Sequence, residues 1–331
     1  MNNFYPKINE NLSTPKFLQL VESIENAVQN GDLEVGDALP SVNDMVKECS
    51  LSRDTVFKAY SELKARKVIE SVRNKGYYIC DNSHRIFLLL DTFKAYKEVL
   101  FGAFRDALPM SYKVDIHFHH YNAVVFRDTI NNAIGKYSHY IVMNFDHPKV
   151  ASSINKIDAS KLLCIDWKVN LPSESSFVGQ DFGQSVYDNL LIAESRLRNY
   201  KKLIFVYPTT TYHPKESILY FENFCKNKGF NYEVLYDESK LDPQKGELYF
   251  TVSDRILAKL LDFIHDNQFI LGTDLGIISY NETPTKKYIK NGISVISTDF
   301  ETMGMKIASF VSSGIKIDEF IPTKFIDRAS I

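Results

Sequence analysis

Apolar and polar residues alternate with a helical period through the first part of the chain. Between residues 17 and 28, apolar side chains recur at steps of three and four, which predicts a helix with one apolar face that ends at Asn30 and Gly31. Ser41 and Ser52 precede two further periodic stretches and can cap a second and a third helix, because a serine hydroxyl accepts hydrogen bonds from first-turn amides. Two short strands are expected at 68–71 and 77–79. This order predicts a winged helix-turn-helix over residues 1–80, a small α+β domain.

From residue 86 the pattern changes to short apolar strands separated by amphipathic helices. The strands are expected at 86–90, 113–118, 140–144, 162–165, 203–207, 232–235, 247–252, 276–279 and 294–296. The helices are expected at 94–108, 123–135, 184–198, 215–228, 255–267 and 302–313. Such alternation is typical of α/β proteins whose parallel sheets are covered by helices on both faces. Residues 86–331 are therefore predicted to form a doubly wound α/β domain, joined to the first domain by a linker at 81–85.

Composition limits the class of protein. A chain of 331 residues is too long for one compact core and suits two or three structural units. Hydrophobic residues make up 44% and charged residues 24%, and no apolar run approaches the roughly 18 residues that span a bilayer, so no membrane partner is expected. Residues 1–12 are polar and do not have the pattern of a signal peptide. The four cysteines lack zinc-ligand or redox-motif spacing, which predicts reduced thiols and a cytoplasmic location.

The segment from Arg53 to Lys75 is basic, with seven lysines and arginines against three acidic residues. Such a segment can face nucleic-acid phosphates, although the same composition also occurs on solvated helix faces. An α-helix fits the major groove, where its first residues, here 52–55, reach base edges and phosphates. Arg53 can pair with guanine or grip a phosphate, and Lys75 at the turn of the hairpin can reach the DNA backbone.

Several short motifs in this region resemble the DNA-binding domain of the GntR family of bacterial regulators. They are Gly-Asp-Leu at 31–33, Gly-Asp-Ala-Leu-Pro-Ser at 36–41, Leu-Ser-Arg-Asp-Thr-Val at 51–56, Ala-Tyr at 59–60 and Lys-Gly-Tyr-Tyr-Ile at 75–79. The resemblance implies binding to double-stranded operator DNA. Asn43 and Phe57 stand where the family often has arginine. The candidate DNA-binding residues are Ser41, Ser52, Arg53, Asp54, Thr55, Lys58, Lys75 and Gly76.

Polar and aromatic residues gather where the predicted strands of the second domain end. In open α/β sheets, ligands bind at the carboxyl ends of the strands. Carboxylates, amides and aromatic faces together suit a sugar or a similar polyol, whereas each residue alone could be a loop cap or a turn former. Trp167, the only tryptophan, could be a stacking platform or a core residue. The candidate ligand-binding residues are Asp91, Phe93, Asp146, His147, Asp166, Trp167, Thr210, Ser253, Asp254 and Asn281.

The second domain resembles the effector domain of the lactose-repressor family, which is similar to periplasmic sugar-binding proteins. The matching segments are Cys-Ile-Asp-Trp at 164–167, Val-Gly-Gln-Asp at 178–181, 198–206, Ser-Asp at 253–254, 276–284, 297–310 and Arg-Ala-Ser at 328–330. Regulators that join a GntR-type head to such a sensor exist, the arabinose and fucose regulators among them. The resemblance implies a periplasmic-binding-protein-like fold of two lobes, with residues 86–331 as the effector-binding and dimerisation domain. It also implies a monosaccharide effector and a homodimer.

These observations predict a one-component transcription regulator, a repressor or an activator, whose affinity for a palindromic operator is controlled by a small molecule. The alternative is an enzyme, or a small-molecule-binding module, with an appended winged helix. No Gly-x-Ser-x-Gly or His-Glu-x-x-His motif is present, which argues against an enzyme. His117, His119 and His120 lie close in sequence, but no carboxylate or cysteine cluster joins them, so neither a metal nor another cofactor is expected.

Overall fold

The computed structural model describes residues 4–9, 12, 14–72, 75–80, 85–168 and 175–331. The chain forms two compact units. The first holds Met1–Thr92, Leu108–Phe177 and Ser309–Ile317, and the second holds Phe93–Ala107, Val178–Ala308 and Asp318–Ile331. Residues 81–84, most of the predicted linker, lie outside the described residues, and Arg85 already begins a strand. The predicted winged helix is therefore part of the first unit.

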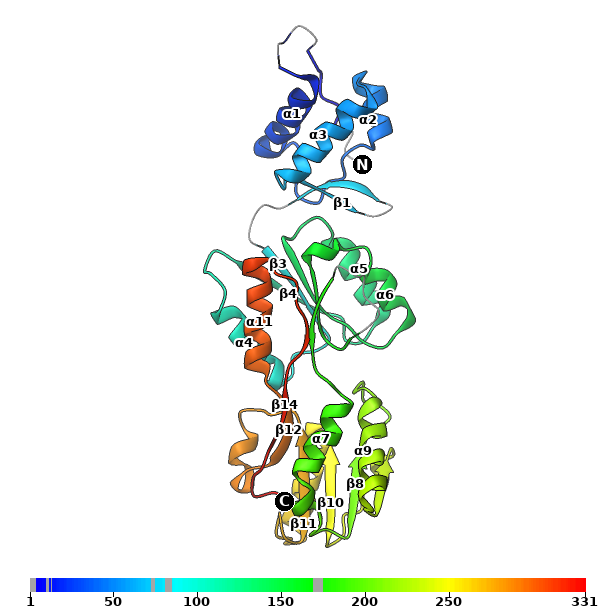
Figure 1. The fold of residues 1–331 in the computed structure, drawn as a ribbon, viewed down its shortest axis with the longest axis vertical. Coiled ribbons are helices and arrows are strands. Elements are labelled where there is room, and N and C mark those ends of the chain that lie inside the picture. Colours follow the sequence, from blue (N-terminus) through cyan, green and yellow to red (C-terminus); the bar gives the residue numbers. More distant parts are fainter. Residues whose placement is uncertain (1–3, 10–11, 13, 73–74, 81–84, 169–174) are drawn as a thin grey trace. The chain divides into compact units, whose positions relative to one another are not determined.

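The amino-terminal head has the predicted order of elements (Figure 1). Its helices are α1 (Lys16–Asn30), α2 (Val42–Cys49) and α3 (Arg53–Ala65). The antiparallel hairpin of β1 (Ile69–Val72) and β2 (Gly76–Ile79) follows. Both predicted caps are confirmed, because Ser41 Oγ accepts from the Asp44 amide at 3.2 Å and Ser52 Oγ accepts from the Thr55 amide at 3.1 Å.

One apolar cluster holds the head together. It includes Leu20 and Ile24 of α1, Met45 of α2 and Leu63 of α3. Tyr60 is fully buried on α3, and its hydroxyl donates to the Pro40 carbonyl at 2.9 Å, which fixes α3 against the chain before α2. The side chains that recur at helical spacing in the sequence are thus those that pack inward. This packing leaves the opposite face of α3 exposed.

The first six-stranded sheet has the order β13-β7-β6-β5-β3-β4. Its strands are β3 (Arg85–Leu90), β4 (Lys113–Phe118), β5 (His139–Met143), β6 (Leu162–Asp166), β7 (Ser176–Gly179) and β13 (Asp318–Phe320). Strands β4, β3, β5 and β6 pair in parallel. The helices α5 (Ala123–Ala133) and α6 (Pro148–Ile154) pack on this sheet through an apolar cluster that includes Phe87, Phe126, Tyr140 and Ile154.

The second six-stranded sheet has the order β14-β12-β11-β10-β8-β9. Its strands are β8 (Lys202–Val206), β9 (Tyr232–Leu235), β10 (Glu247–Thr251), β11 (Leu275–Tyr280), β12 (Ser294–Thr298) and β14 (Thr323–Ile326). All neighbours pair in parallel except β14, which is antiparallel to β12.

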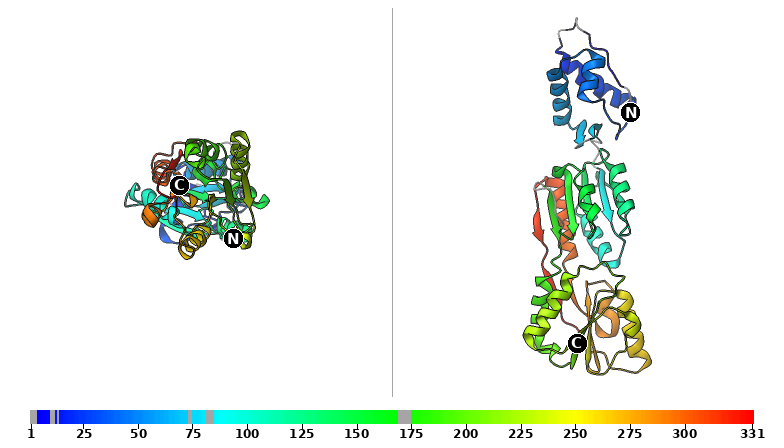
Figure 2. Two further views of the ribbon diagram at one scale, coloured as in Figure 1. Left: turned by 90° about the horizontal axis from the view of Figure 1, so that it is seen from below. Right: turned by 90° about the vertical axis from the view of Figure 1, so that its right-hand side faces the viewer.

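Helices cover both faces of this second sheet (Figure 2). They are α7 (Gln184–Ile192), α8 (Glu194–Leu197), α9 (Glu216–Lys228) and α10 (Asp254–Asp266). Helices α7 and α9 lie on one face and α10 lies on the other (Figure 2). Two further helices are α4 (Ala95–Asp106) and α11 (Phe300–Ser313). Gly304 of α11 lies so close to α4 that an added Cβ would be 2.5 Å from the Leu100 carbonyl oxygen.

The doubly wound α/β fold is confirmed, and all nine predicted strands are present within a residue or two. Three further strands, β7, β13 and β14, were not predicted, because each has only three or four residues and too little alternation to mark it. The single helix predicted at 184–198 is divided into α7 and α8 at Ala193, and the short helix α6 was missed.

Candidate DNA-binding face and effector site

The exposed end of α3 carries the predicted DNA contacts. Ser52, Arg53 and Asp54 are exposed, and Thr55 is half-buried. The hydroxyls of Ser52 and Thr55 lie 2.8 Å apart, so they form one polar edge at the start of the helix. The Arg53 guanidinium lies 5.6 Å from the centroid of the Phe57 ring, one turn further along. A hydrogen-bond donor, two hydroxyls and the positive end of a helix therefore share one open surface, which suits phosphates and base edges.

Two other candidates are oriented differently. The Lys58 ammonium lies 4.1 Å from the centroid of the Phe17 ring on α1. A helix turns about 100° per residue, so Lys58 does not share the direction of Phe57. The Ser41 hydroxyl donates to an Asp44 carboxylate oxygen at 2.7 Å and is already engaged in capping α2.

The hairpin of the head is packed onto the first sheet and its helices. Val72 of β1 is buried in the same apolar cluster as Phe87 and Phe126. Glu70 of β1 is only 5% exposed, and its Oε2 lies 2.5 Å from the Lys161 Nζ. The hairpin is therefore attached to the first sheet and its flanking segments by apolar packing of Val72 and by the ion pair between Glu70 and Lys161.

Lys75, directly before β2, lies beside the end of α5. Lys75 and Gly76 are exposed, while Arg73 and Asn74 lie outside the described residues. Lys75 lines a small pocket of about 180 Å³ together with Asn131, Asn132 and Lys136. Gly76 has a φ of +101°, a backbone conformation that L side chains rarely adopt, so a glycine is required there.

In the first unit, the predicted ligand residues Asp91 and His147 are held by their own surroundings. Asp91 follows β3 and is buried, and its carboxylate accepts hydrogen bonds from the Thr92 amide and the Tyr121 hydroxyl. His147 caps α6 by accepting from the Lys149 amide at 3.1 Å. Both side chains thus have structural partners in the chain itself.

The other candidates of the first unit are more open. Asp146 is exposed. Asp166 ends β6 with a φ of +76°, and Trp167 after it is half-buried. The Trp167 carbonyl accepts a hydrogen bond from Asn144 Nδ2 at 2.8 Å, whereas the buried Asn144 Oδ1 has no hydrogen-bond partner in the described part of the chain.

In the second unit, Asp254 is the candidate with a charged partner. Its carboxylate is 60% exposed and lies 3.0 Å from the Nζ of Lys286, whose side chain is 2% exposed. The Lys286 ammonium also donates to the carbonyls of Tyr280 and Asn281, at 3.2 and 2.7 Å. Burial lowers the pKa of Lys286, and the neighbouring Asp254 carboxylate opposes that shift.

The remaining candidates of the second unit form no single cluster. Ser253 precedes α10, and its amide donates to Thr251 Oγ1 at 3.1 Å. Thr210 and Phe93 are exposed, and the Phe93 ring meets Phe101 edge-on. Asn281 follows β11 with a φ of +62°, and its Oδ1 is buried without a hydrogen-bond partner among the residues described.

A polar and aromatic cluster at the carboxyl ends of the second sheet was not predicted. His213, in the loop after β8, meets the Tyr280 ring edge-on at 4.7 Å and the Phe182 ring at 5.2 Å. His213 Nε2 and Ser279 Oγ are both buried and, within the described ranges, have no hydrogen-bond partner. Unpaired buried polar atoms beside aromatic faces are the groups that a bound polyol satisfies. The signal in the sequence was weak, because His213 lies several residues beyond its strand.

His213 is a neutral group in this cluster. Burial lowers its pKa from 6.5 to about 3, and the positive charge of Lys94 acts in the same direction. A neutral imidazole has one nitrogen that donates and one that accepts, which matches a hydroxyl group.

A pocket of about 500 Å³ opens where β11 and β12 end. It is lined by 282–284, Lys287, 297–301, Val99 and two residues of β14. None of the ten predicted ligand residues lines this pocket, although Asn281 precedes it directly. The ring of Phe300, in its wall, packs against the ring of Tyr96 in a tilted arrangement, with the centroids 4.6 Å apart. Acidic, basic and apolar side chains all line the pocket.

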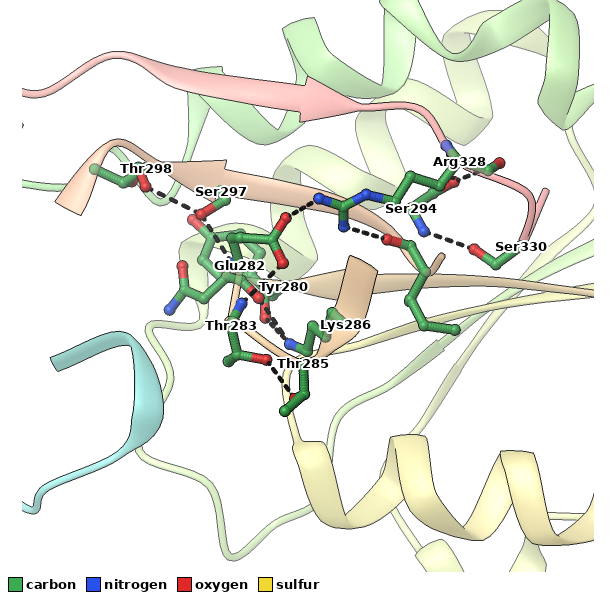
Figure 3. A network of polar contacts seen from close by, with 12 residues as sticks. Tyr280, Glu282, Thr283, Thr285, Lys286, Ser294, Ser297, Thr298, Arg328 and Ser330 are labelled. Atoms are coloured by element: carbon green, nitrogen blue, oxygen red, sulfur yellow. Dashed lines mark hydrogen bonds and ion pairs between the residues drawn. The ribbon is translucent and has the colours of Figure 1, made fainter. Parts of the chain in front are cut away.

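A hydrogen-bonded network fixes the wall of this pocket (Figure 3). The Arg328 guanidinium pairs with the Glu282 carboxylate and donates to the Ile293 carbonyl at 2.8 Å. The Ser294 amide donates to Ser330 Oγ at 2.7 Å, and the Glu282 amide donates to Ser297 Oγ at 2.8 Å. The final residues of the chain thus hold the segment after β11 and the start of β12 in place (Figure 3).

The histidines at 117–120 have separate surroundings. His119 is buried, bonds the Met143 carbonyl at 3.1 Å and stacks on Phe145, whereas His120 is exposed. Burial lowers the pKa of His117. Among the described residues no group of three or more histidine, cysteine or acidic side chains could hold a metal ion.

In the part of the chain that the structure describes, every helix is too short or too polar to cross a membrane.

The amino-terminal region matches known regulators in sequence. The family model described as "Bacterial regulatory proteins, gntR family" matches residues 17–79. The chain is 34% identical over 77 residues to the HTH-type transcriptional repressor YtrA of Bacillus subtilis, which is 23% of this chain and 59% of YtrA. It is 31% identical over 90 residues to the uncharacterized HTH-type transcriptional regulator YhcF of the same species, which is 27% of this chain and 73% of YhcF. The chain thus spans less than two thirds of YtrA.

Solved structures match most of the chain in fold. A LacI family transcriptional regulator from Lactobacillus casei, solved with bound glucose, superposes with a TM-score of 0.60 at 13% sequence identity. The match covers 75% of this chain and all of that one. At this identity the likeness concerns the fold, which is that of lactose-repressor-type effector domains.

Proposed function

Because the chain belongs to the gntR family of bacterial regulatory proteins, we propose that it is a one-component transcription regulator whose affinity for operator DNA is controlled by a small molecule. The observation that carries this proposal is the exposed amino-terminal end of α3, where Arg53 stands beside the paired hydroxyls of Ser52 and Thr55 on a family-matched head. An α-helix presented in this way can enter the major groove. We infer no catalytic role and no cofactor for the chain, and we infer that it acts in the cytoplasm, where its DNA is.

Arg53 is the residue proposed to bind DNA most strongly. Its guanidinium can form a bidentate pair with guanine or hold a phosphate, and the Ser52 and Thr55 hydroxyls suit phosphate oxygens. Lys58 has a smaller proposed role, because its ammonium lies over the Phe17 ring of α1 and does not share the direction of Arg53. Lys75 and Gly76 can contact the DNA backbone only from the position in which the packed hairpin holds them.

The proposed effector is a sugar. Support comes from the buried, unpaired Nε2 of His213 beside the rings of Phe182 and Tyr280. The buried and unpaired Ser279 Oγ and Asn281 Oδ1, at the carboxyl end of β11, add to it. Such atoms favour an uncharged ligand rich in hydroxyl groups, since each hydroxyl both donates and accepts. The fold relative from Lactobacillus casei was solved with bound glucose, which supports the same class of ligand.

The packed hairpin supplies a route from effector to DNA. Because Val72 packs in the apolar cluster of the first sheet and Glu70 pairs with Lys161, a rearrangement of this sheet layer can move the hairpin of the head directly. A change of roughly 1–3 kcal/mol in operator affinity is sufficient for regulation. We propose a homodimer on a palindromic operator, because one head alone contacts too few bases for high specificity.

Selection of bound duplexes from a random pool tests the DNA-binding part. We expect an enriched palindromic sequence and a steep fall in affinity as salt rises, because phosphate contacts release counterions. Arg53→Ala should lose the enriched site and keep its thermal stability. Failure of the wild-type protein to enrich any sequence would refute the proposal.

A thermal-shift screen with monosaccharides tests the effector part. A ligand that binds the native state alone raises the melting temperature, by an amount that grows with its concentration. Asp254→Ala and Asn281→Ala should reduce the shift without reducing DNA binding, whereas Arg53→Ala should leave the shift unchanged. A shift seen only with phosphorylated or amino compounds would contradict the proposed neutral ligand.

A further inference from the structure

Phe57 is an apolar side chain in an unusual position on α3. Its side chain is 42% exposed, whereas Val56, Tyr60 and Leu63 of the same helix are fully buried. It is the only large hydrophobic residue of α3 that is exposed. A single exposed apolar residue needs no explanation on an ordinary surface. Its meaning here depends on where it points.

The neighbours of Phe57 define that direction. Residues 53 and 57 are one helical turn apart and lie on the same side of α3. Another flank of α3 faces α1, because Lys58 lies over Phe17 and Arg66, directly after α3, bonds Glu25. Phe57 therefore projects on the open side of the helix, next to Arg53.

The ring is also held in position before any ligand arrives. The Arg53 guanidinium lies 5.6 Å from its centroid, within the range of a cation–π contact. Such a contact favours an arrangement in which the guanidinium and the ring lie side by side on the exposed surface of α3. The two residues form one recognition unit with a polar half and an apolar half.

An apolar ring in the major groove is selective for thymine. Thymine alone presents a methyl group there. Cytosine has only a hydrogen on the corresponding ring carbon, and the purines present the N7 acceptor with O6 or the N6 amino group at their edges. Phenylalanine can cover a methyl group favourably, but opposite a polar base edge it removes water and offers no hydrogen bond in return. We infer that Phe57 is a specificity-determining residue that reads the C5-methyl group of a thymine beside the base or phosphate contacted by Arg53. This inference rests on the proposed function, in which α3 enters the major groove.

Deoxyuridine tests the inference directly, because it differs from thymidine only in the missing methyl group. In the operator selected with the wild-type protein, each dT is replaced by dU, one half-site position at a time. We expect one or two positions at which the replacement weakens wild-type binding about fourfold per methyl group, the effect of burying one such group. Replacement at other positions should change binding by less than a factor of two.

Two variants separate the methyl contact from other causes. Phe57→Ala should bind the dT and dU forms of the sensitive position equally, and Phe57→Leu, which keeps an apolar side chain, should keep part of the preference. Ile270→Ala, at an exposed apolar residue of the second unit, is the matched control and should keep the full wild-type preference.

The outcomes are distinguishable. If wild-type protein selects an operator but no dU replacement weakens binding, or if Phe57→Ala keeps the same preference for dT, Phe57 does not read a methyl group. If the wild-type protein selects no sequence at all, the proposed DNA-binding function fails and the inference fails with it.

Discussion

The ion pair between Glu70 and Lys161 joins the DNA-binding head to the sheet behind it. Their side chains are 6% and 26% exposed, and the two charged atoms are 2.5 Å apart. Lys161→Met removes the cation and leaves the Glu70 carboxylate buried. Breaking a fully buried pair costs about 3–5 kcal/mol, and because water can partly reach the lysine side we expect about 2–3 kcal/mol here.

Hydrogen exchange measures this cost where it arises. Amides of β1 and β2 should lose protection about 30-fold or more in Lys161→Met, since each 1.4 kcal/mol is a factor of ten. Amides of α10, in the other unit, should be unchanged. The double variant Glu70→Gln with Lys161→Met should regain part of the lost protection, because it no longer buries an unpaired charge.

Arg127→Met provides the matched control, since it breaks a pair with Asp128 in which both side chains are about half exposed. An exposed pair contributes between 0 and 1 kcal/mol. If Lys161→Met and Arg127→Met lower stability equally, the hairpin is not held by a buried charge. In the proposed regulator, Lys161→Met should also weaken the effect of the sugar on DNA affinity while each ligand still binds.

Three further outcomes are expected. Arg53→Ala should weaken operator binding by about 5- to 150-fold, the range of one bidentate base contact, in a mobility-shift titration; unchanged binding would contradict the role of α3. The pKa of His213 is lowered in the folded state, so the unfolded state takes up a proton below pH 6.5 that the folded state does not, and the free energy of unfolding should fall by up to about 2 kcal/mol from pH 7 to pH 5. In urea unfolding, His213→Asn should show a shallower dependence of this free energy on pH, and an unchanged dependence would contradict the assignment to His213. Gly272→Ala should destabilise the chain by more than about 2 kcal/mol, because its Cβ would lie 2.2 Å from the Ala329 oxygen, whereas Gly229→Ala, with open space around it, should cost about 1 kcal/mol in the same assay.

Much of the fold could be predicted because its signals are local. Ser41 and Ser52 cap the helices that their positions indicated, and Tyr60 and Leu63 pack inward as their spacing requires. The DNA-binding candidates shared one helix end, so their proximity followed from sequence order alone. The ligand candidates came from many strand ends, and periodicity could not tell which of them would be neighbours.

The side-chain partners show where local signals end. Asp91 was predicted as a ligand residue, yet the Tyr121 hydroxyl bonds its carboxylate. Asp254 was predicted alone, yet the buried Lys286 lies against it. His213, which no motif marked, lies among the aromatic rings of the second sheet. The sequence spacing of these pairs carries no information about their contact, because strand order brings them together.

By itself, the sequence determined most of the helices and strands, the caps, the α/β class and the family of the head, because each depends on residues within a few positions of one another. Only the tertiary structure decided that Glu70 meets Lys161, 91 residues away, and that the hairpin is packed against the first sheet. Such contacts depend on how sheets and helices with similar apolar faces pack against each other. Because the burial of apolar surface is non-directional, the pattern of apolar residues does not specify that packing. The particular polar partners are fixed only when that packing is complete.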